Sequence, residues 1–216
     1  MELGLGAGWV ETEYEAMGIA MDRPGVRIDR MVETLELVRQ HYSGDQIEVL
    51  GQHVSASGFS GAPTMDRVPP IMIGGGSKRV LGIAGREADI VSINFNNSAG
   101  KIGPEGVGSG TVDGTSQKIE WIRAGAGERF SELEIEIGAY FTVVTDHRDA
   151  VQGEFAKLFG LDVSDIANHP HCLIGPVEEL VEKIQQRREE LGINYVTFGG
   201  AVIDDVAPIV EALSGT

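Results

Sequence analysis

The feature that most constrains the fold is a regular alternation between short apolar strands and amphipathic helices. Apolar and β-branched runs predict strands at residues 2–7, 71–73, 88–94, 134–145 and 195–198. Helical spacing predicts helices at residues 27–42, 116–130, 149–159, 177–191 and 204–213, and a further helix that opens after Ser77. Such alternation requires a parallel sheet with right-handed crossovers, which fits either an open doubly wound α/β sheet or part of a (β/α)₈ barrel.

Two segments interrupt the alternation. Residues 47–60 are expected to be extended, and their glycine and serine breaks indicate a small hairpin. Residues 96–115 are rich in Gly, Ser and Pro and lack periodicity, so we expect a long flexible loop of the kind that forms lids or binding loops. The 216 residues are expected to form a single domain, because this length suits one substantial core.

The stretch Pro69–Arg79 combines a buried strand, a run of glycines and a helix start. The glycines let a ligand approach the backbone closely, and a helix N-terminus with neighbouring cations is a ready anion site. Taken alone, the same stretch also fits an ordinary βα turn without a ligand. The candidate anion-binding residues are Gly74, Gly75, Gly76, Ser77, Lys78 and Arg79.

Other candidate residues also follow predicted strands. Gly6, Ala7, Gly8 and Trp9 end the first strand, but their spacing lacks the third glycine of a dinucleotide-binding motif. Trp9 fits either a ring-stacking or a core role. Asn94 fits either a cofactor contact or a cap of its own turn. These loops lie at strand C-terminal ends, where both architectures place their active sites.

Charge and composition exclude several classes of partner. The net charge is −16, so we expect neither nucleic acid nor an anionic membrane among the partners. No apolar run approaches the length of a membrane span, and the N-terminal sequence does not resemble a signal peptide. A single cysteine, Cys172, suits a reducing compartment, so we expect a cytoplasmic protein. The run His169-Pro170-His171-Cys172 matches no standard metal-site spacing, and we expect no metal.

An ordered set of motifs resembles the luciferase-like monooxygenase superfamily over nearly the whole chain. The motifs are Glu-Leu-Gly-Leu-Gly-Ala-Gly-Trp at the N-terminus, Glu13-Tyr14, the helix start Arg27-Ile28-Asp29-Arg30, Pro-Pro-Ile-Met-Ile-Gly-Gly-Gly-Ser-Lys-Arg, Glu-Ala-Asp-Ile-Val-Ser-Ile-Asn, and Ile-Gly-Pro-Val-Glu-Glu-Leu. The set looks closest to the branch that depends on the deazaflavin coenzyme F420. The resemblance implies a barrel of the TIM type with the cofactor at its C-terminal face.

The resemblance also implies a chemistry. The isoalloxazine or deazaflavin ring would lie near Gly6, Ala7 and Gly8, and its phosphate near the second group of glycines, with Lys78 and Arg79 close by. The implied activity is that of an oxidoreductase that transfers a hydride between reduced F420 and a small organic substrate. Alternatives are an FMN-dependent monooxygenase, and a truncated chain that binds a cofactor or a partner without turnover.

In this family the strand at Leu3 resembles the fourth of eight, and three βα units normally precede it. We therefore expect about five βα units of an incomplete barrel, corresponding to strands four to eight. The strands at Leu3 and Tyr195 should be open edges, through which we expect homo-oligomers to form. The barrel interior is expected to be lined by Leu3, Leu5, Met72, Ile90, Ile137, Ala139 and Val196.

Overall fold

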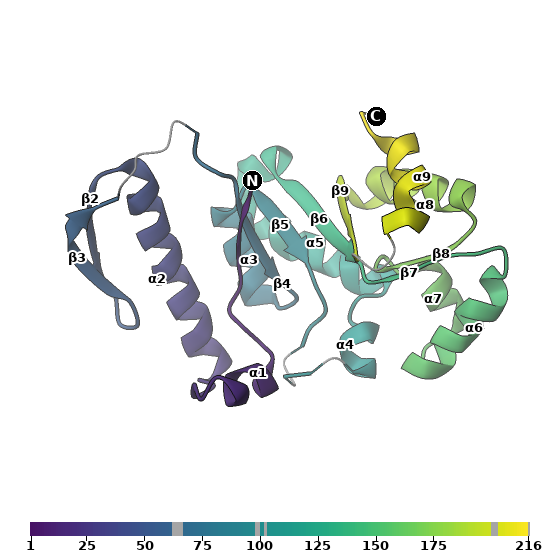
Figure 1. The fold of residues 1–216 in the computed structure, drawn as a ribbon, viewed down its shortest axis with the longest axis horizontal. Coiled ribbons are helices and arrows are strands. Elements are labelled where there is room, and N and C mark those ends of the chain that lie inside the picture. Colours follow the sequence, from purple (N-terminus) through teal and green to yellow (C-terminus); the bar gives the residue numbers. More distant parts are fainter. Residues whose placement is uncertain (62–66, 98–99, 102, 200–202, 216) are drawn as a thin grey trace.

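The computed structural model describes residues 1–61, 67–97, 100–101, 103–199 and 203–215, and its centre is a parallel five-stranded sheet (Figure 1). The strands of this sheet, in their spatial order, are β1 Leu3–Leu5, β4 Ile71–Gly75, β5 Ile90–Ile93, β6 Glu134–Ala139 and β9 Tyr195–Phe198. Spatial order follows chain order without a reversal, whereas a doubly wound sheet reverses at its switch point. The fold is therefore of the (β/α)₈-barrel type, and β1 and β9 form the two edges of the sheet, as expected.

Two further strand pairs lie outside this sheet. β2 (Gln46–Leu50) and β3 (Ser55–Ser60) form the expected antiparallel hairpin. β7 (Phe141–Val144) pairs in parallel with β8 (Cys172–Gly175). The expected single strand at residues 134–145 is wrong. The strand is interrupted at Tyr140, and the two strands on either side of it, β6 and β7, belong to different sheets. β8 is not predicted, since a run of four buried residues shows no alternation.

Nine α-helices occur in the described part of the chain, with a 3₁₀ turn at Gly127–Glu132. They are α1 Glu11–Ala16, α2 Pro24–Ser43, α3 Lys78–Glu87, α4 Pro104–Gly108, α5 Val112–Ala126, α6 Arg148–Phe159, α7 Val163–Asn168, α8 Val177–Leu191 and α9 Ile203–Leu213. None of these helices combines the length and the apolar character needed to cross a membrane.

The expected loop at residues 96–115 is wrong for α4 and for the first turn of α5. Pro104 occupies the first turn of α4, and the Thr111 side chain starts α5 by accepting a hydrogen bond from the Gly114 backbone at 3.4 Å. The flexibility of this segment and the single-domain organisation remain predictions. The helix expected at residues 204–213 is α9, and Asp204 lies inside its first turn.

One face of the five-stranded sheet is apolar and covered by helices. The strand register places Ile73, Val91 and Ile135 opposite one another on this face. These side chains pack in one cluster with Leu81 of α3 and Ile122 of α5, both of which are fully buried. Burying such a side chain contributes about 1.5–3 kcal/mol, so this layer supplies much of the core. We call it the helix-covered face.

The opposite face, here called the second face, is mainly polar or small. Its register aligns Gly74, Ser92, Glu136 and Tyr195 in one row across four strands. None of these residues joins a hydrophobic cluster with the described helices. In a (β/α)₈ barrel, the face away from the helices is the barrel interior. The second face consists of Gly4, Met72, Gly74, Ile90, Ser92, Glu134, Glu136, Gly138, Tyr195 and Thr197.

The expected interior lining is correct for Met72 and Ile90 and wrong for the other residues. The misplaced residues, which the register puts on the helix-covered face, are Leu3, Leu5, Ile137, Ala139 and Val196. The physical reason is that successive strand residues point to opposite faces, so an apolar residue alone does not reveal which face it serves. In this chain most of the apolar strand side chains pack against the helices and do not point into the barrel interior.

Candidate functional site

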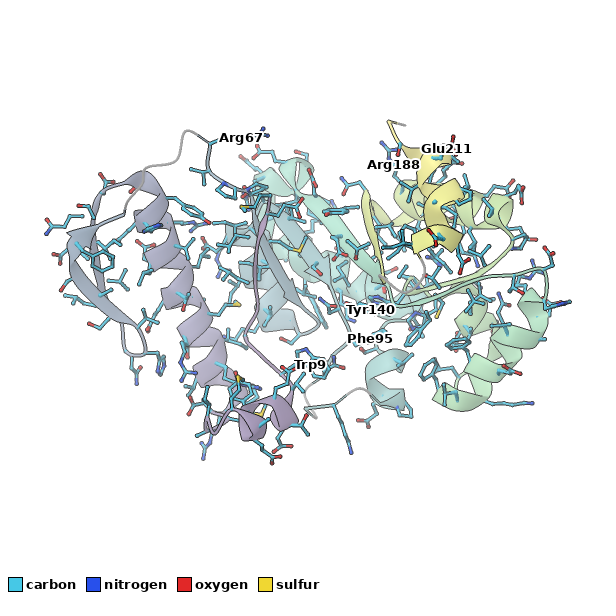
Figure 2. The ribbon with its side chains drawn as sticks, viewed as in Figure 1. Trp9, Arg67, Phe95, Tyr140, Arg188 and Glu211 are labelled. Carbon is cyan, nitrogen blue, oxygen red and sulfur yellow. The ribbon has the colours of Figure 1, made fainter. Side chains whose placement is uncertain are left out.

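A cavity of about 620 Å³, here called the cofactor cavity, lies where β1, β4, β5 and β6 end. In Figure 2, Trp9, Phe95 and Tyr140 lie near one another below the central strands, and all three line this cavity. The predicted cofactor residues that line it are Gly6, Ala7, Gly8, Trp9, Gly74, Gly75, Gly76, Ser77 and Asn94. The structure thus brings together residues from three strand ends that the sequence identifies separately.

Lys78 and Arg79 do not line the cofactor cavity but a neighbouring hollow between α2 and α3. The Arg79 guanidinium forms an ion pair with Asp29 at 2.5 Å and donates to the Gly25 carbonyl at 3.4 Å. Both partners belong to the first turns of α2. Arg79 therefore holds the N-terminal ends of α2 and α3 together, beside the cavity and not inside it.

Arg27, on the first turns of α2, is a cavity residue that the sequence does not single out. Only 7% of it is exposed, and its Nε and Nη1 atoms are buried without a hydrogen-bond partner among the described residues. A buried charge without a partner is costly and calls for a counter-charge. The sequence feature that could have identified Arg27 is its position in the helix. Arg27, Met31 and Leu35 follow one another at a spacing of four residues and therefore share the buried side of α2.

Ser77 caps α3 as predicted, with its side chain accepting a hydrogen bond from the Val80 backbone at 3.5 Å. The helix N-terminus at this point carries a partial positive charge that favours anions. Ser77 and Arg27 line the same cavity, and Arg79 ties the starts of their two helices together, so two independent anion-binding features lie on its walls. This arrangement suits a phosphate group.

Glycine is needed at the different positions of the cavity wall for different physical reasons. A Cβ atom at Gly75 would overlap the Val80 side chain, and one at Gly76 would overlap the Phe95 carbonyl, so internal packing already requires glycine there. Gly8 has a φ of 72°, which L side chains rarely adopt. A Cβ at Gly6, in contrast, would have no heavy atom within 4 Å. Gly6 is therefore the position where the missing side chain leaves room for a ligand.

Asn94, just after β5, is held from three sides. Its Nδ2 atom donates to the Ser92 hydroxyl at 3.1 Å, its Oδ1 atom accepts from the Tyr140 hydroxyl, and its backbone carbonyl accepts from Lys118 Nζ at 2.7 Å. Burial lowers the pKa of Lys118 to about 8. Partial burial and the negative charge of Glu136 raise the pKa of Tyr140 to about 12, so its hydroxyl stays protonated at neutral pH. Tyr140 is a second cavity residue that the sequence does not single out.

The two histidines of the motif at residues 169–172 support this end of the cavity. The His171 ring stacks on Tyr140 at a centroid distance of 5.3 Å and bonds to the Gly138 carbonyl at 2.8 Å, while His169 bonds to the Val107 carbonyl at 2.9 Å. Burial lowers the pKa of His169 to about 4 and that of His171 to about 3, so both are neutral at pH 7. Within the described residues, no group of three or more His, Cys, Asp or Glu side chains is placed to hold a metal ion.

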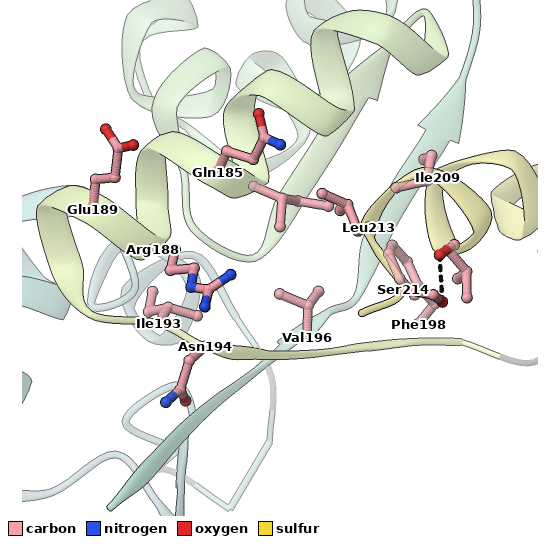
Figure 3. A pocket seen from close by; sticks show the side chains of 12 residues that line it. Gln185, Arg188, Glu189, Ile193, Asn194, Val196, Phe198, Ile209, Leu213 and Ser214 are labelled. Carbon is pink, nitrogen blue, oxygen red and sulfur yellow. Dashed lines mark hydrogen bonds between the residues drawn. The ribbon is translucent and has the colours of Figure 1, made fainter. Parts of the chain in front are cut away.

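A second, larger cavity of about 750 Å³ lies between α8, β9 and α9 (Figure 3). Its walls are mixed, with the apolar residues Val196, Phe198 and Ile209 and the charged residues Arg188 and Glu189. It contains none of the predicted cofactor residues. It borders the edge strand β9.

The sequence matches the luciferase-like monooxygenase family over residues 1–169. The chain belongs to this family. No curated protein sequence matches it.

Solved structures resemble this luciferase-like chain in fold. An F420-dependent secondary alcohol dehydrogenase, in complex with an F420–acetone adduct, has a TM-score of 0.66 and 19% identity, with 92% of this chain and 63% of that chain covered. Riboflavin lyase RcaE, with modified FMN and riboflavin, has a TM-score of 0.61 and 15% identity, with coverages of 95% and 61%. Coenzyme F420-dependent tetrahydromethanopterin reductase from Methanopyrus kandleri has a TM-score of 0.60 and 15% identity, with coverages of 97% and 72%. The chain thus spans less than two thirds of the first two proteins.

Proposed function

We propose that this chain binds coenzyme F420 and serves in hydride transfer between the reduced deazaflavin and a small organic substrate. The observation that carries the proposal is the meeting of Arg27, a buried guanidinium with unpaired nitrogens, and the capped N-terminus of α3 at Ser77 in one cavity. Two F420-dependent enzymes among the similar structures support the choice of cofactor.

The residues present fit a phosphate-bearing ring cofactor. Arg27 and the first-turn N–H groups of α3 would hold the phosphate, and the backbone from Gly6 to Gly8 would lie against the ring. Trp9 lines the cavity and is 37% exposed, which favours ring stacking over a core role. When bound, the deazaflavin supplies the hydride chemistry, and the protein binds, orients and shields the ring.

F420 differs from FMN in its polyanionic glutamate tail, for which Lys78 and Arg79 provide positive charge in the hollow next to the cavity. The net charge of −16 makes such local cations important. We expect Lys78→Ala, which leaves the contacts of Arg79 to α2 in place, to weaken F420 binding more at low salt than at high salt, and to leave FMN binding nearly unchanged. Equal effects on both cofactors at all salt concentrations would argue against this electrostatic role.

The alternative is an FMN-dependent monooxygenase, because FMN ends at a phosphate that the same two anchors fit. A chain that binds cofactor without turnover is the third candidate. Fluorescence titration of the purified chain with F420 and FMN separates the first two, and turnover of the loaded chain with candidate alcohols separates an enzyme from a binder. Failure of both cofactors to bind would overturn the proposed function.

The site assignment is tested by Arg27→Met, which keeps an unbranched, flexible side chain and removes the guanidinium and its charge. A charge-assisted hydrogen bond to phosphate contributes about 1.5–3 kcal/mol, so affinity for the phosphate-bearing cofactor should fall about 10- to 100-fold. Riboflavin, which lacks the phosphate, should bind the variant and the wild type equally. Because the variant also removes an unpaired buried charge, we expect its thermal stability to stay equal or to rise.

Two control variants sharpen this test. Arg86→Met removes an arginine of the neighbouring hollow, outside the cavity, and should leave the affinities for FMN and riboflavin unchanged. Gly6→Val adds a side chain where a Cβ meets no atom within 4 Å, so it should block FMN, F420 and riboflavin alike without unfolding the chain. Equal losses of riboflavin and FMN in Arg27→Met would contradict the phosphate assignment.

We also propose that the open edges β1 and β9 support homo-oligomers, with the cavity beside β9 as part of the contact. Val210→Asp, on the α9 wall of that cavity, should lower the mass measured by light scattering. Leu158→Asp, on the exposed side of α6, should not. A wild-type chain that is monomeric at every concentration would refute this proposal. A cytoplasmic location likewise remains a proposal, resting on the single cysteine.

A further inference from the structure

We propose that Tyr140, held in place by Asn94, recognises a hydrogen-bond donor on the bound ring, namely the imide N–H that flavins and deazaflavins share. This inference rests on the proposed function and concerns the part of the cavity where β5 and β6 end. Neighbouring strands lie about 4.8 Å apart, so the end of β6 lies about 10 Å from the end of β4, a span that a fused three-ring system can bridge. The order β4-β5-β6 places Asn94 and Tyr140 at successive positions along that span.

The Tyr140 ring has a fixed orientation. A Cβ atom at Gly138 would lie 2.6 Å from Cε1 and 2.8 Å from Cζ of Tyr140, so the ring lies directly over this glycine. On another side it stacks on His171, with an angle of 4° between the ring planes, and Phe95 is 5.6 Å away. Tyr140 is nevertheless 52% exposed and lines the cavity. The ring is therefore positioned before any ligand arrives.

The hydrogen bonds of Asn94 determine which way the proton of Tyr140 points. The Asn94 Nδ2 atom faces the Ser92 carbonyl at 3.4 Å and the Ser92 hydroxyl at 3.1 Å. A carbonyl oxygen only accepts, so the amide nitrogen must occupy this side, and Oδ1 faces Tyr140. Oδ1 also only accepts, so the Tyr140 hydroxyl donates to it.

This assignment leaves the lone pairs of the Tyr140 oxygen as its remaining hydrogen-bonding capacity. A ligand group that meets this oxygen must therefore donate a hydrogen bond. The nearby walls contributed by Phe95, Phe141 and Phe159 are apolar and provide no competing donor. The Tyr140 oxygen therefore offers the ligand an acceptor and selects a donor.

The test compares FMN with N3-methyl-FMN, which has the same phosphate but lacks the imide N–H. We expect the wild-type chain to bind FMN about tenfold more tightly than the methylated form, as fits the loss of one hydrogen bond. Tyr140→Phe keeps the ring over Gly138 and removes only the hydroxyl. In this variant the preference should disappear, because FMN binding weakens while binding of N3-methyl-FMN does not.

A matched control is Tyr195→Phe, since Tyr195 lies on the same second face but its hydroxyl bonds to Glu2 at 3.3 Å, outside the cavity. The tenfold preference should persist in this variant. A preference that persists in Tyr140→Phe would overturn the inference and leave the proposed function intact. A wild-type chain that binds neither FMN nor F420 would overturn both.

Discussion

Two consecutive residues of β6 show how differently the two faces of the sheet are used. Ile137 points to the helix-covered face, is fully buried and packs in the main hydrophobic cluster. Glu136 points to the second face, where it is 4% exposed and accepts a hydrogen bond from the Thr197 hydroxyl at 2.6 Å. Both side chains are enclosed, but one is held by packing and the other by a polar contact.

Strands of a parallel sheet that are packed on both faces read as continuous apolar runs. The strands of this chain instead alternate, with small or polar residues such as Gly74, Ser92 and Gly138 on the second face. Continuing the same alternation past the strand ends leads to Asn94 after Ser92 and to Tyr140 after Gly138. The cofactor cavity is therefore the extension of the second face beyond the sheet, which is why it carries hydrogen-bonding groups.

The largest expected effect tests the helix-covered face. Ile137→Ala removes a fully buried side chain from the main cluster and should lower the free energy of unfolding by about 2–5 kcal/mol, measured by urea denaturation. Met72→Ala is the matched control on the second face, where Met72 is only partly buried. It should cost less than half as much. Equal costs would mean that both faces are packed to the same degree.

An intermediate effect concerns the histidines that support the end of the second face. The pKa values of about 4 for His169 and about 3 for His171 lie below the ordinary 6.5 because both rings are buried. Between these values and pH 6.5 the unfolded chain binds more protons than the folded chain, so the free energy of unfolding should fall as the pH drops through this window. We expect His171→Gln to make this fall less steep than in the wild type.

His147→Gln provides the control for the histidine prediction, because His147 is exposed. This variant should keep the wild-type dependence on pH, which also contains the titration of carboxylates. Circular dichroism melting curves from pH 7 to pH 4 are sufficient for the comparison. If the free energy of unfolding of His171→Gln fell as steeply with decreasing pH as that of the wild type, the buried His171 ring would not resist protonation.

Local patterns predict much of this molecule, and long-range pairing accounts for what they miss. All five strands of the central sheet and most long helices follow from periodicity, and Ser77 follows from its position before an apolar stripe. The interruption at Tyr140 between β6 and β7 does not follow from the local pattern. It depends on the pairing of β7 with β8, which lies about thirty residues later in the chain. Arg27 could not be assigned to the site from the sequence for the same reason. Its charge among apolar helix positions is visible in the sequence, but the cavity that it lines is formed by distant segments of the chain.

The smallest expected effect is the most direct measure of how enclosed the second face is. Glu136→Gln keeps the acceptor for Thr197 and removes only the negative charge, so stability should change by less than about 1 kcal/mol. Because that charge helps to raise the pKa of Tyr140 to about 12, the pKa should fall part of the way toward 10, with the contribution from burial remaining. Phenolate absorbance, referenced to Tyr140→Phe, measures this shift. Glu134→Gln, also on the second face, is the control and should leave the Tyr140 pKa unchanged, because burial and the charge of Glu136 raise that pKa. Both variants are compared in a Tyr195→Phe background, because burial and the charges of Glu2, Glu136 and Glu134 also raise the pKa of Tyr195. A Tyr140 pKa that Glu136→Gln leaves unchanged would mean that solvent screens the two groups, and that the second face is an open surface and not the wall of an interior.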